Sequence, residues 1–574
     1  MDALGCAAKL TPKSAKILLV LLALGLFALA HAQSKFSNDG VSDQVKHLFA
    51  EQRWQEIVRL GDSTEHPPGD FDFYYGTALG QVGRLADSQR VFVSGARLLP
   101  EDKRFPLELA GVAFKQKHYP QAARFLRRAL QLDPNDSYGN DFLGTVYFLQ
   151  GNTEAALKYW NRVKKPVIAQ IQASPVPKIN SSLLDRAFAF APASTLSLTD
   201  LLTTDPRIGG LGIFPSYQFD LQAREDGKFD VVFRNQERDG WGQTKLEKLF
   251  LLFRKLPFLS VTPEIYNLNH EAINFVSMYR WDAQKRRIAA ELSGPFKGNP
   301  RFRYGLWADL RDENWDIRNS FQGPAPLLGS LNMRREAVSA TFSAFQSGRW
   351  QWSAEVEVSH RNFRSVDPGV VLIASLLARG YQLKQTTRLD VSLWRLPERR
   401  LTLDGGLSSQ AGRVWSRPSQ SFEKLQGSAR LHWFPQSRDD DYEVQHSIRA
   451  GKTFGAVPFD ELFMLGLERD SDLWMRGHIG TRDGRKGSAP LGRDYFLSNW
   501  EADKKVYGNG IFAVKLGPFL DTGKISDAFD GLGSHEWLWD LGAQAKVRVF
   551  GGGVVFSYGK DLRSGNNAFY VSVR

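Results

Sequence analysis

From about residue 240 to Arg574 the chain consists of short segments in which apolar and polar residues alternate. Between Trp350 and Ser359, tryptophan, alanine and valine occupy one parity, and glutamine, serine and glutamate occupy the other. Residues 540–549 repeat the pattern, and polar turns that contain glycine separate such segments. A period of two residues is that of a β-strand, so this region is predicted to form a large antiparallel sheet.

The two faces of this sheet are suited to two different solvents. Charged residues on one parity and apolar residues on the other fit a barrel with a wet lumen and a lipid-facing exterior. A soluble sandwich or a propeller would also alternate. Export of the chain, the lack of cysteine in its mature part, and tryptophan and tyrosine near strand ends favour the membrane barrel. At about 20 residues per strand and turn, residues 240–574 allow about sixteen strands.

Residues 1–32 have the features of a secretory signal that is removed on export. A positive segment precedes an apolar run and a small-residue cleavage site: Lys9, Lys13 and Lys16, then Ile17–Ala30, then Ala30-His31-Ala32. A transmembrane anchor is the alternative, but the apolar run is shorter than the ~20 residues that a spanning helix needs. We therefore expect the protein in the outer membrane of a Gram-negative-type bacterium, with its N-terminal domains in the periplasm.

Cysteine and charge exclude several classes of function. The single cysteine, Cys6, lies within the signal, so the mature chain can form no disulfide, thiolate metal site or cysteine nucleophile. The formal net charge of +12 is a broad excess over the chain. It implies a mild attraction to anionic lipid or lipopolysaccharide and gives little support for a nucleic-acid partner.

The first third of the chain repeats with a period of 34 residues. Small residues recur where two helices would cross, a large apolar residue follows four positions later, and proline marks the repeat ends. The aligned sets are Gly76, Ala110 and Gly144; Ser88, Ala122 and Ala156; Phe92, Leu126 and Trp160; and Pro100 with Pro134. The pattern resembles the tetratricopeptide (TPR) repeat. It predicts an α-helical TPR solenoid over 38–168, with three repeats in 69–168 and a degenerate one in 41–66. Such a solenoid commonly binds a partner in its concave groove, or serves as a spacer or oligomerisation unit.

Residues 169–182 are rich in proline and polar residues and are predicted to be a linker. Residues 183–238 then predict a small α+β module, with a short strand at Phe188–Phe190, a helix over 197–211 and a hairpin at Asp226-Gly227. The module resembles a POTRA domain, which precedes the barrels of BamA-type assembly factors and two-partner-secretion transporters. The resemblance implies that it guides incoming strands by edge pairing. The alternative is a small linker domain that binds no client.

Three short motifs between residues 473 and 525 resemble those of the BamA, TamA and FhaC superfamily. They are Trp474-Met475-Arg476-Gly477-His478, Ser498-Asn499-Trp500-Glu501 and Phe519-Leu520-Asp521-Thr522-Gly523. In that superfamily the first motif belongs to an extracellular loop that folds back into the barrel lumen. The resemblance implies that Arg476 is held by Asp521, with Glu501 as a second candidate. Gly477 would let the loop tip turn tightly, and Gly523 would relieve crowding inside the wall.

The strand parity agrees with that pairing, because Phe519 and Asp521 fall on one face of their segment. A guanidinium can donate two parallel hydrogen bonds to a carboxylate, which gives a directional tie. The motifs also depart from those of the superfamily. His478 stands where an aromatic residue is usual, Met475 stands where valine or isoleucine is usual, and the chain ends in Arg574 rather than an aromatic residue.

We find no catalytic constellation in the sequence. Ala450-Gly451-Lys452-Thr453 resembles the end of a phosphate-binding loop, but His446 stands where the loop needs its first glycine. Neither a His-Glu-x-x-His nor a Gly-x-Ser-x-Gly motif is present. The expectation is therefore a protein that is not an enzyme and has no cofactor and no metal.

The predicted fold is α+β multidomain: a TPR solenoid, a POTRA-like module and a transmembrane antiparallel barrel of about 16 strands. The resemblance implies an outer-membrane protein assembly factor or a protein translocation pore, whose periplasmic front end receives an unfolded outer-membrane or secreted client. Periplasmic accessory proteins are further expected partners, through the TPR domain. The alternative is a TPR-barrel exporter, a porin for a polysaccharide, which should have an open lumen rather than one plugged by a loop. A surface receptor or adhesin anchor is a third class, for which the sequence offers no positive sign.

Overall fold

A computed structural model describes residues 41–63, 70–238, 256–318, 326–436, 440–508, 512–526, 532–534, 536–549 and 552–573. The predicted signal segment 1–32 and the predicted start of the barrel at 240–255 lie outside these residues. The chain divides into two compact units, residues 1–150 and residues 151–574, and each is described by itself. The division falls inside the predicted TPR domain 38–168.

The first unit is built from α-helices, each of which packs against the next. Residues 41–50 are helical, and they are followed by α2 (Trp54–Ser63), α3 (Phe71–Gln81), α4 (Leu85–Leu98), α5 (Arg104–Lys115), α6 (Tyr119–Leu132) and α7 (Ser137–Leu149). The small residues of the repeat pattern lie in the helix contacts. A Cβ atom on Gly76 would come within 2.6 Å of the Phe92 ring, and Ala110 and Ala122 are fully buried, as is Gly144 on α7. Larger side chains there would push the helices apart.

No helix in the described part of the chain is long and apolar enough to cross a membrane.

The second unit begins with α8 (Thr153–Trp160), on which Ala156 is buried, and continues into a small α+β module. Its elements are β1 (Ile168–Ser174), α9 (Ser181–Ala187), α10 (Leu198–Leu211), β2 (Ser216–Ala223) and β3 (Phe229–Gln236). The strand order is β1-β3-β2, with β1 parallel and β2 antiparallel to β3. Helix α10 and the β2–β3 hairpin coincide with the helix and the hairpin expected from the sequence.

Two expectations for this module are wrong. The range 169–182 is not a linker throughout, because Ile168–Ser174 forms a strand that pairs with β3. Prolines on both sides hide this strand in the sequence, although proline is tolerated at strand ends, where no ladder bond is lost. Phe188–Phe190 does not form a strand. Instead, the two phenylalanine rings pack against the rings of Phe219 and Phe233, so their apolar character serves the core.

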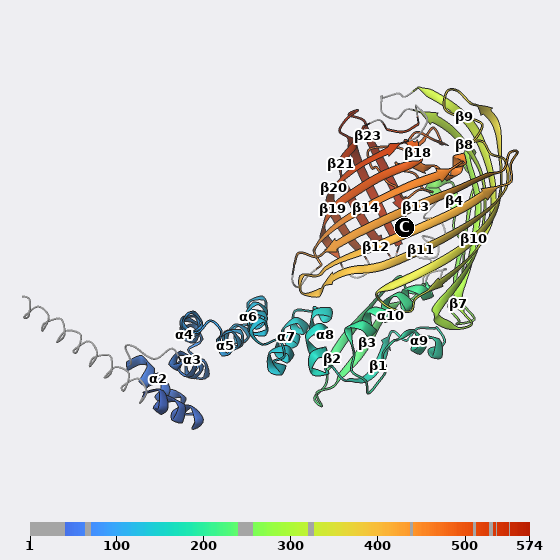
Figure 1. Cartoon of the computed structure of the whole chain (residues 1–574). Helices are drawn as coiled ribbons and strands as arrows, with labels where there is room; N and C mark the ends of the chain where they lie inside the picture. The colour runs from blue at the N-terminus through green and yellow to red at the C-terminus, as the bar shows by residue number, and fades with distance from the viewer. Residues whose placement is uncertain are drawn as a thin grey trace, which may run out of the picture. The chain divides into compact units, whose positions relative to one another are not determined.

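A large antiparallel sheet of about sixteen strands closes into a barrel, as predicted. Its longer strands are β6 (Ile273–Arg280), β7 (Lys285–Phe296), β8 (Asn299–Arg318), β9 (Leu327–Ala344), β10 (Trp350–Asp367), β11 (Gly380–Leu396), β12 (Leu401–Val414), β13 (Gln420–Trp433), β14 (Tyr442–Gly455), β19 (Asp494–Gly508), β20 (Phe512–Ser526), β21 (Leu538–Val549), β22 (Gly552–Asp561) and β23 (Asn567–Val573). The short strands β4 (Ser260–Val261) and β5 (Glu264–Leu268) both pair with β6. Figure 1 shows the strands running obliquely around the barrel.

The alternating pattern places apolar side chains outside the barrel and charged side chains inside it. On β10, Val356 and Val358 are 50% and 51% exposed, whereas Glu357 between them is 4% exposed. Arg361 on the same strand is fully buried. Charges buried on the inner wall need partners, because an isolated charge away from water is very costly.

Helix α8 and helix α10 of the small module contact turns that connect barrel strands. Arg207 on α10 donates to the carbonyl oxygen of Phe345, in the turn between β9 and β10, at 3.3 Å. On α8, Lys158 Nζ and Tyr159 OH both reach a carboxylate oxygen of Glu398, in the turn between β11 and β12, at 2.6 and 2.9 Å. These contacts attach the module to the barrel within the second unit.

Candidate functional site

Residues 456–493, between β14 and β19, lie inside the barrel and are called the plug. The plug contains the short pair β15 (Phe463–Met464) and β18 (Leu491–Gly492) and the hairpin of β16 (Thr481–Arg482) and β17 (Arg485–Lys486). Its apolar residues share two clusters with the wall: Phe459, Met464 and Leu491 with Trp315, Leu331 and Phe363, and Leu465, Leu473 and Met475 with Leu497, Ile525 and Leu538. This burial makes the plug part of the barrel's packed interior.

Arg476 lies in the plug, is 3% exposed, and donates hydrogen bonds to side chains from three strands. Its backbone N–H and Nε reach Asp521 Oδ2 on β20 at 3.0 and 2.8 Å, and Nη2 reaches Oδ1 at 2.5 Å. Nη1 binds Glu501 Oε1 on β19 at 2.6 Å and Gln544 Oε1 on β21 at 3.0 Å. The structure thus brings together the arginine and both carboxylates that the sequence singled out.

The surroundings of this arginine satisfy both the cation and its partner. The Phe519 ring lies against the guanidinium, with 3.8 Å between Cζ and the ring centre. Asp521 is fully buried and also accepts a hydrogen bond from Asn499 Nδ2 at 2.7 Å. A buried ion pair is favourable only when its geometry is good and its remaining lone pairs have donors. Both conditions are met here, so the contact is a directional tie between plug and wall.

A second cation extends the network along the wall. Lys546 Nζ on β21 donates to Glu501 Oε2 and to Asp503 Oδ2, both at 2.6 Å. Gln544 Nε2 also donates to Glu501 Oε2, at 3.0 Å. Charges of opposite sign therefore alternate from Arg476 to Asp503. The chemistry of this set is electrostatic tethering, because each of its charged groups is occupied by a partner.

Glycines give the plug room to approach the wall. A Cβ atom on Gly523 would lie 3.2 Å from both Leu465 and Met475 of the plug. Gly477 lies in a tight turn, closed by a hydrogen bond from the His478 backbone N–H to the Met475 carbonyl oxygen at 3.1 Å. A Cβ atom there would also lie 2.6 Å from the Asp540 carboxylate. Sequence reasoning missed Gly559 on β22, whose Cβ atom would come 2.2 Å from the Arg476 carbonyl oxygen.

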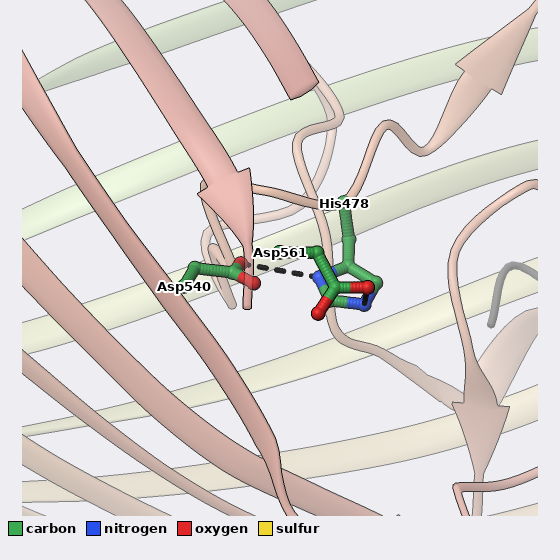
Figure 2. A group of neighbouring side chains, drawn as sticks. All are labelled: His478, Asp540 and Asp561. Carbon is green, nitrogen blue, oxygen red and sulfur yellow. Dashed lines mark hydrogen bonds and ion pairs between the residues drawn. The ribbon is translucent and has the colours of Figure 1, made fainter. Parts of the chain in front are cut away.

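His478, two residues beyond Arg476, meets β21 at a second point and one further strand, β22 (Figure 2). Its Nδ1 lies 3.1 Å from Asp540 Oδ2 on β21, and its Nε2 lies 3.7 Å from Asp561 Oδ2 at the end of β22. All three side chains are buried. Phenylalanine, which has no polar side-chain atom, would make neither contact. In the described part of the chain, these three residues also form a group able to hold a metal ion.

Two further groups of charges tie the plug to other parts of the wall. Asp470 accepts from Arg280 on β6 at 3.1 Å and from Arg287 on β7 at 2.6 Å. Lys486 Nζ donates to Asp470 and to Glu313 on β8, at 2.8 and 2.7 Å.

The second group lies against strands β10, β11 and β13. Asp460 Oδ1 of the plug is 3.0 Å from Arg361 Nη1 on β10. Its neighbour Glu461 accepts from Lys384 on β11 at 2.9 Å and from Lys424 on β13 at 3.4 Å. Neither group was predicted from the sequence. The available signal was a loop with several acidic residues beside strands whose inward parity carries lysine and arginine.

A cavity of about 1120 Å³ remains between the plug and the wall. Its lining is rich in charged residues from both, among them Arg430, Glu443 and Lys515 of the wall and Arg469 and Asp472 of the plug. Small-molecule sites are mostly apolar with few polar groups, so this cavity resembles a hydrated internal space more than a ligand pocket.

Fold and site together define a class of protein: a closed antiparallel barrel that carries a tethered internal plug and is preceded by an α+β module and a helical array. Three solved structures are similar to this chain in their backbone fold. They are BamA from Haemophilus ducreyi lacking POTRA domains 1–3 (11% identity, TM-score 0.41, 71% of this chain and 85% of that one), CdiB from Escherichia coli (14%, 0.46, 71% and 75%) and CdiB from Acinetobacter baumannii (12%, 0.41, 71% and 74%). No protein-family description and no curated protein sequence matches the chain. At these identities and TM-scores the likeness says nothing about activity.

Proposed function

We propose that this protein is an outer-membrane machine that inserts or translocates unfolded polypeptides, and that its N-terminal helices and α+β module receive the client in the periplasm. The observation that carries the proposal is the plug itself, fixed inside the barrel by Arg476, Asp521 and Glu501. The three motifs that resemble the BamA, TamA and FhaC superfamily contribute these residues. The barrel acts by its shape, without nucleotide or cofactor.

The proposed location follows from how a polypeptide can exist in lipid. Every backbone polar group in a bilayer needs an internal partner, and a closed sheet meets this requirement. The outward parity of this barrel is apolar and its inward parity is charged, which is the arrangement that lipid outside and water inside require. We therefore place the barrel in the outer membrane and the preceding domains in the periplasm.

The plug favours a polypeptide client over a polysaccharide. A passive glycan conduit needs a continuous open lumen, whereas here charged ties hold a loop of the chain across the interior. An unfolded polypeptide can in addition bind to a sheet edge, because its backbone N–H and C=O groups can pair with the unpaired C=O and N–H groups of the edge strand. Strand β2 is an edge of the small sheet among the described strands, since β3 pairs with it on one side.

The proposal is tested by conditional depletion of the protein in its own host. We expect specific outer-membrane barrel proteins or secreted proteins to decrease, while surface polysaccharide measured in the same cells stays unchanged. Re-expression of the wild-type chain should restore them. Loss of polysaccharide with unchanged membrane and secreted proteins would instead establish the glycan exporter and refute the proposed client.

A further inference from the structure

We propose that His478, Asp540 and Asp561 form a binding site for one divalent transition-metal ion, zinc above all, that ties the plug to β21 and β22. One ring nitrogen of His478 and one oxygen of each aspartate lie within 4.8 Å of one another. The three ligands come from the plug, from β21 and from the end of β22, as Figure 2 shows. A metal there would cross-link three segments that are far apart in the sequence.

The charge of the group calls for a cation. Asp540 and Asp561 are 0% and 1% exposed, so both carboxylates are removed from water. The neighbouring cations are already engaged: Arg476 binds Asp521 and Glu501, and Lys546 binds Glu501 and Asp503. A protonated His478 would balance only one of the two aspartates. A divalent ion balances both and leaves the imidazole neutral, as a metal ligand must be.

An unsatisfied oxygen points to the same conclusion. Asp540 Oδ2 accepts from the Gly477 backbone N–H at 2.6 Å and faces His478 Nδ1. The other oxygen, Oδ1, is buried and has no hydrogen-bond partner among the described residues. A buried acceptor without a donor is costly, and a metal ion would remove that cost.

The donor set selects the type of ion. One imidazole nitrogen with two carboxylates suits zinc and related first-row ions, whereas calcium and magnesium prefer oxygen ligands throughout. Zinc bonds of about 2.0–2.2 Å in a tetrahedral site put neighbouring ligand atoms about 3.3 Å apart. His478 Nδ1 lies 3.1 Å from Asp540 Oδ2, close to such an edge, whereas Nε2, on the other side of the ring, lies 3.7 Å from Asp561 Oδ2. One ion can bind only one of the two ring nitrogens, so side-chain rotation must bring both carboxylates to the same nitrogen to complete the site.

The test uses the full-length mature chain, purified in detergent with a tag that contains no histidine and stripped with a chelator. Zinc chloride is then added, bound zinc is counted by mass spectrometry after gel filtration, and the unfolding temperature is measured with and without zinc. We expect one zinc ion per chain and a rise of several degrees in the unfolding temperature at saturation. His478→Phe, which restores an aromatic residue, and Asp540→Asn should each abolish both effects while the barrel still folds.

His360→Phe is the matched control, because this histidine lies on β10 beside Tyr381, outside the proposed site, and its loss should leave zinc binding unchanged. Two results would overturn the proposal. One is a wild-type chain that binds no zinc at concentrations up to about a hundred micromolar, with an unfolding temperature that responds to pH alone; His478 would then be a protonated bridge between two aspartates. The other is His478→Phe protein that binds zinc as well as the wild type.

Discussion

The guanidinium of Arg476 is surrounded by Asp521, Glu501 and Gln544, so its removal leaves a fully buried carboxylate without a counter-charge. Removing one partner of a buried pair costs about 3–5 kcal/mol. We predict that Arg476→Ala lowers the free energy of unfolding of the barrel by about 3 kcal/mol. The loss is measured as a lower temperature for the change from folded to unfolded mobility on denaturing gels.

Arg334 provides the control for this prediction. It pairs with Glu336 at 2.7 Å, but both side chains are about half exposed. Exposed pairs contribute less than ~1 kcal/mol, so Arg334→Ala should leave the transition nearly unchanged. Arg476→Lys should fall between the two, because lysine keeps the charge and loses the forked geometry. Equal transitions for Arg476→Ala and Arg334→Ala would show that the buried tie adds nothing to stability.

Gly559 leaves room for the plug backbone to lie against β22. A methyl group at this position would lie 2.2 Å from the Arg476 carbonyl oxygen and 3.0 Å from the Gly477 nitrogen. We predict that Gly559→Ala displaces the plug backbone and destabilises the barrel by about 1–3 kcal/mol, as overpacking does. Gly427→Ala on β13 is the matched control, since a Cβ atom there meets no atom within 4 Å. The unfolding temperature is measured for both variants and should fall only for Gly559→Ala.

A double variant checks that the effect of Gly559→Ala passes through Arg476. In the Arg476→Ala background the plug is already loosened at this point. The extra methyl group should therefore cost less there than in the wild type, because contacting sites are not additive. Full additivity of the two changes would place the strain elsewhere.

The sequence allowed some of these residues to be predicted and hid others for a physical reason. Arg476 and Asp521 carry motif resemblance, and strand parity alone puts Asp521 on the same face as Phe519. Gly559 and Asp470 carry no such mark. Their roles depend on which distant strand each one faces, and strand parity fixes the face of a residue but not the height of a loop inside a barrel.

At the scale of the elements, Glu398 joins α8 to the β11–β12 turn. Burial raises the pKa of Glu398, but hydrogen bonds, among them those from Lys158 and Tyr159, together lower it by more. The pKa of Glu398 therefore lies below the ordinary value. A carboxyl group with a lowered folded pKa stabilises the folded state above its unfolded pKa, and this contribution is lost as pH falls through the folded value. The junction should therefore hold at neutral pH and weaken in acid.

We predict that hydrogen exchange of the α8 backbone accelerates as pH falls below the ordinary glutamate value of 4.5, after correction for the intrinsic rate. In Glu398→Gln the helix should exchange faster already at neutral pH and show no further acid step. Glu225→Gln, in the exposed turn of the β2–β3 hairpin, removes the same charge without touching the junction and should behave as the wild type. An acid step that persists in Glu398→Gln would assign it to another group.

The elements themselves were predictable to different degrees. The barrel strands and α10 follow from long periodic segments, whereas β1 has seven residues between prolines and pairs in parallel with a strand some sixty residues away. Its partner is thus set by the folded module rather than by its neighbours in the chain. The same holds for Phe188 and Phe190, whose apolar character reports packing against Phe219 and Phe233 and not strand formation.

At the scale of the whole molecule, the plug is held at several points of the wall and not by one lock. Arg476 ties it to β19, β20 and β21, Asp470 ties it to β6 and β7, and Glu461 ties it to β11 and β13. These anchors lie on separate runs of strands and share no partner. Each one therefore keeps the plug inside the lumen after another has been cut, even though each cut lowers stability.

This arrangement predicts how the conductance of the barrel in planar bilayers responds to mutation. Wild type, Arg476→Ala and Asp470→Asn should each conduct weakly, because three anchor groups hold the plug in the wild type and two remain in each single variant. The double variant Arg476→Ala, Asp470→Asn should conduct several-fold more and approach a variant in which a short glycine-serine linker replaces the plug. The double variant Arg334→Ala, Glu336→Ala removes the same kinds of charge from exposed positions and should conduct as the wild type. If Arg476→Ala alone reached the conductance of the plugless variant, the other two anchor groups would contribute nothing to closure, and the plug would be governed by a single ion pair.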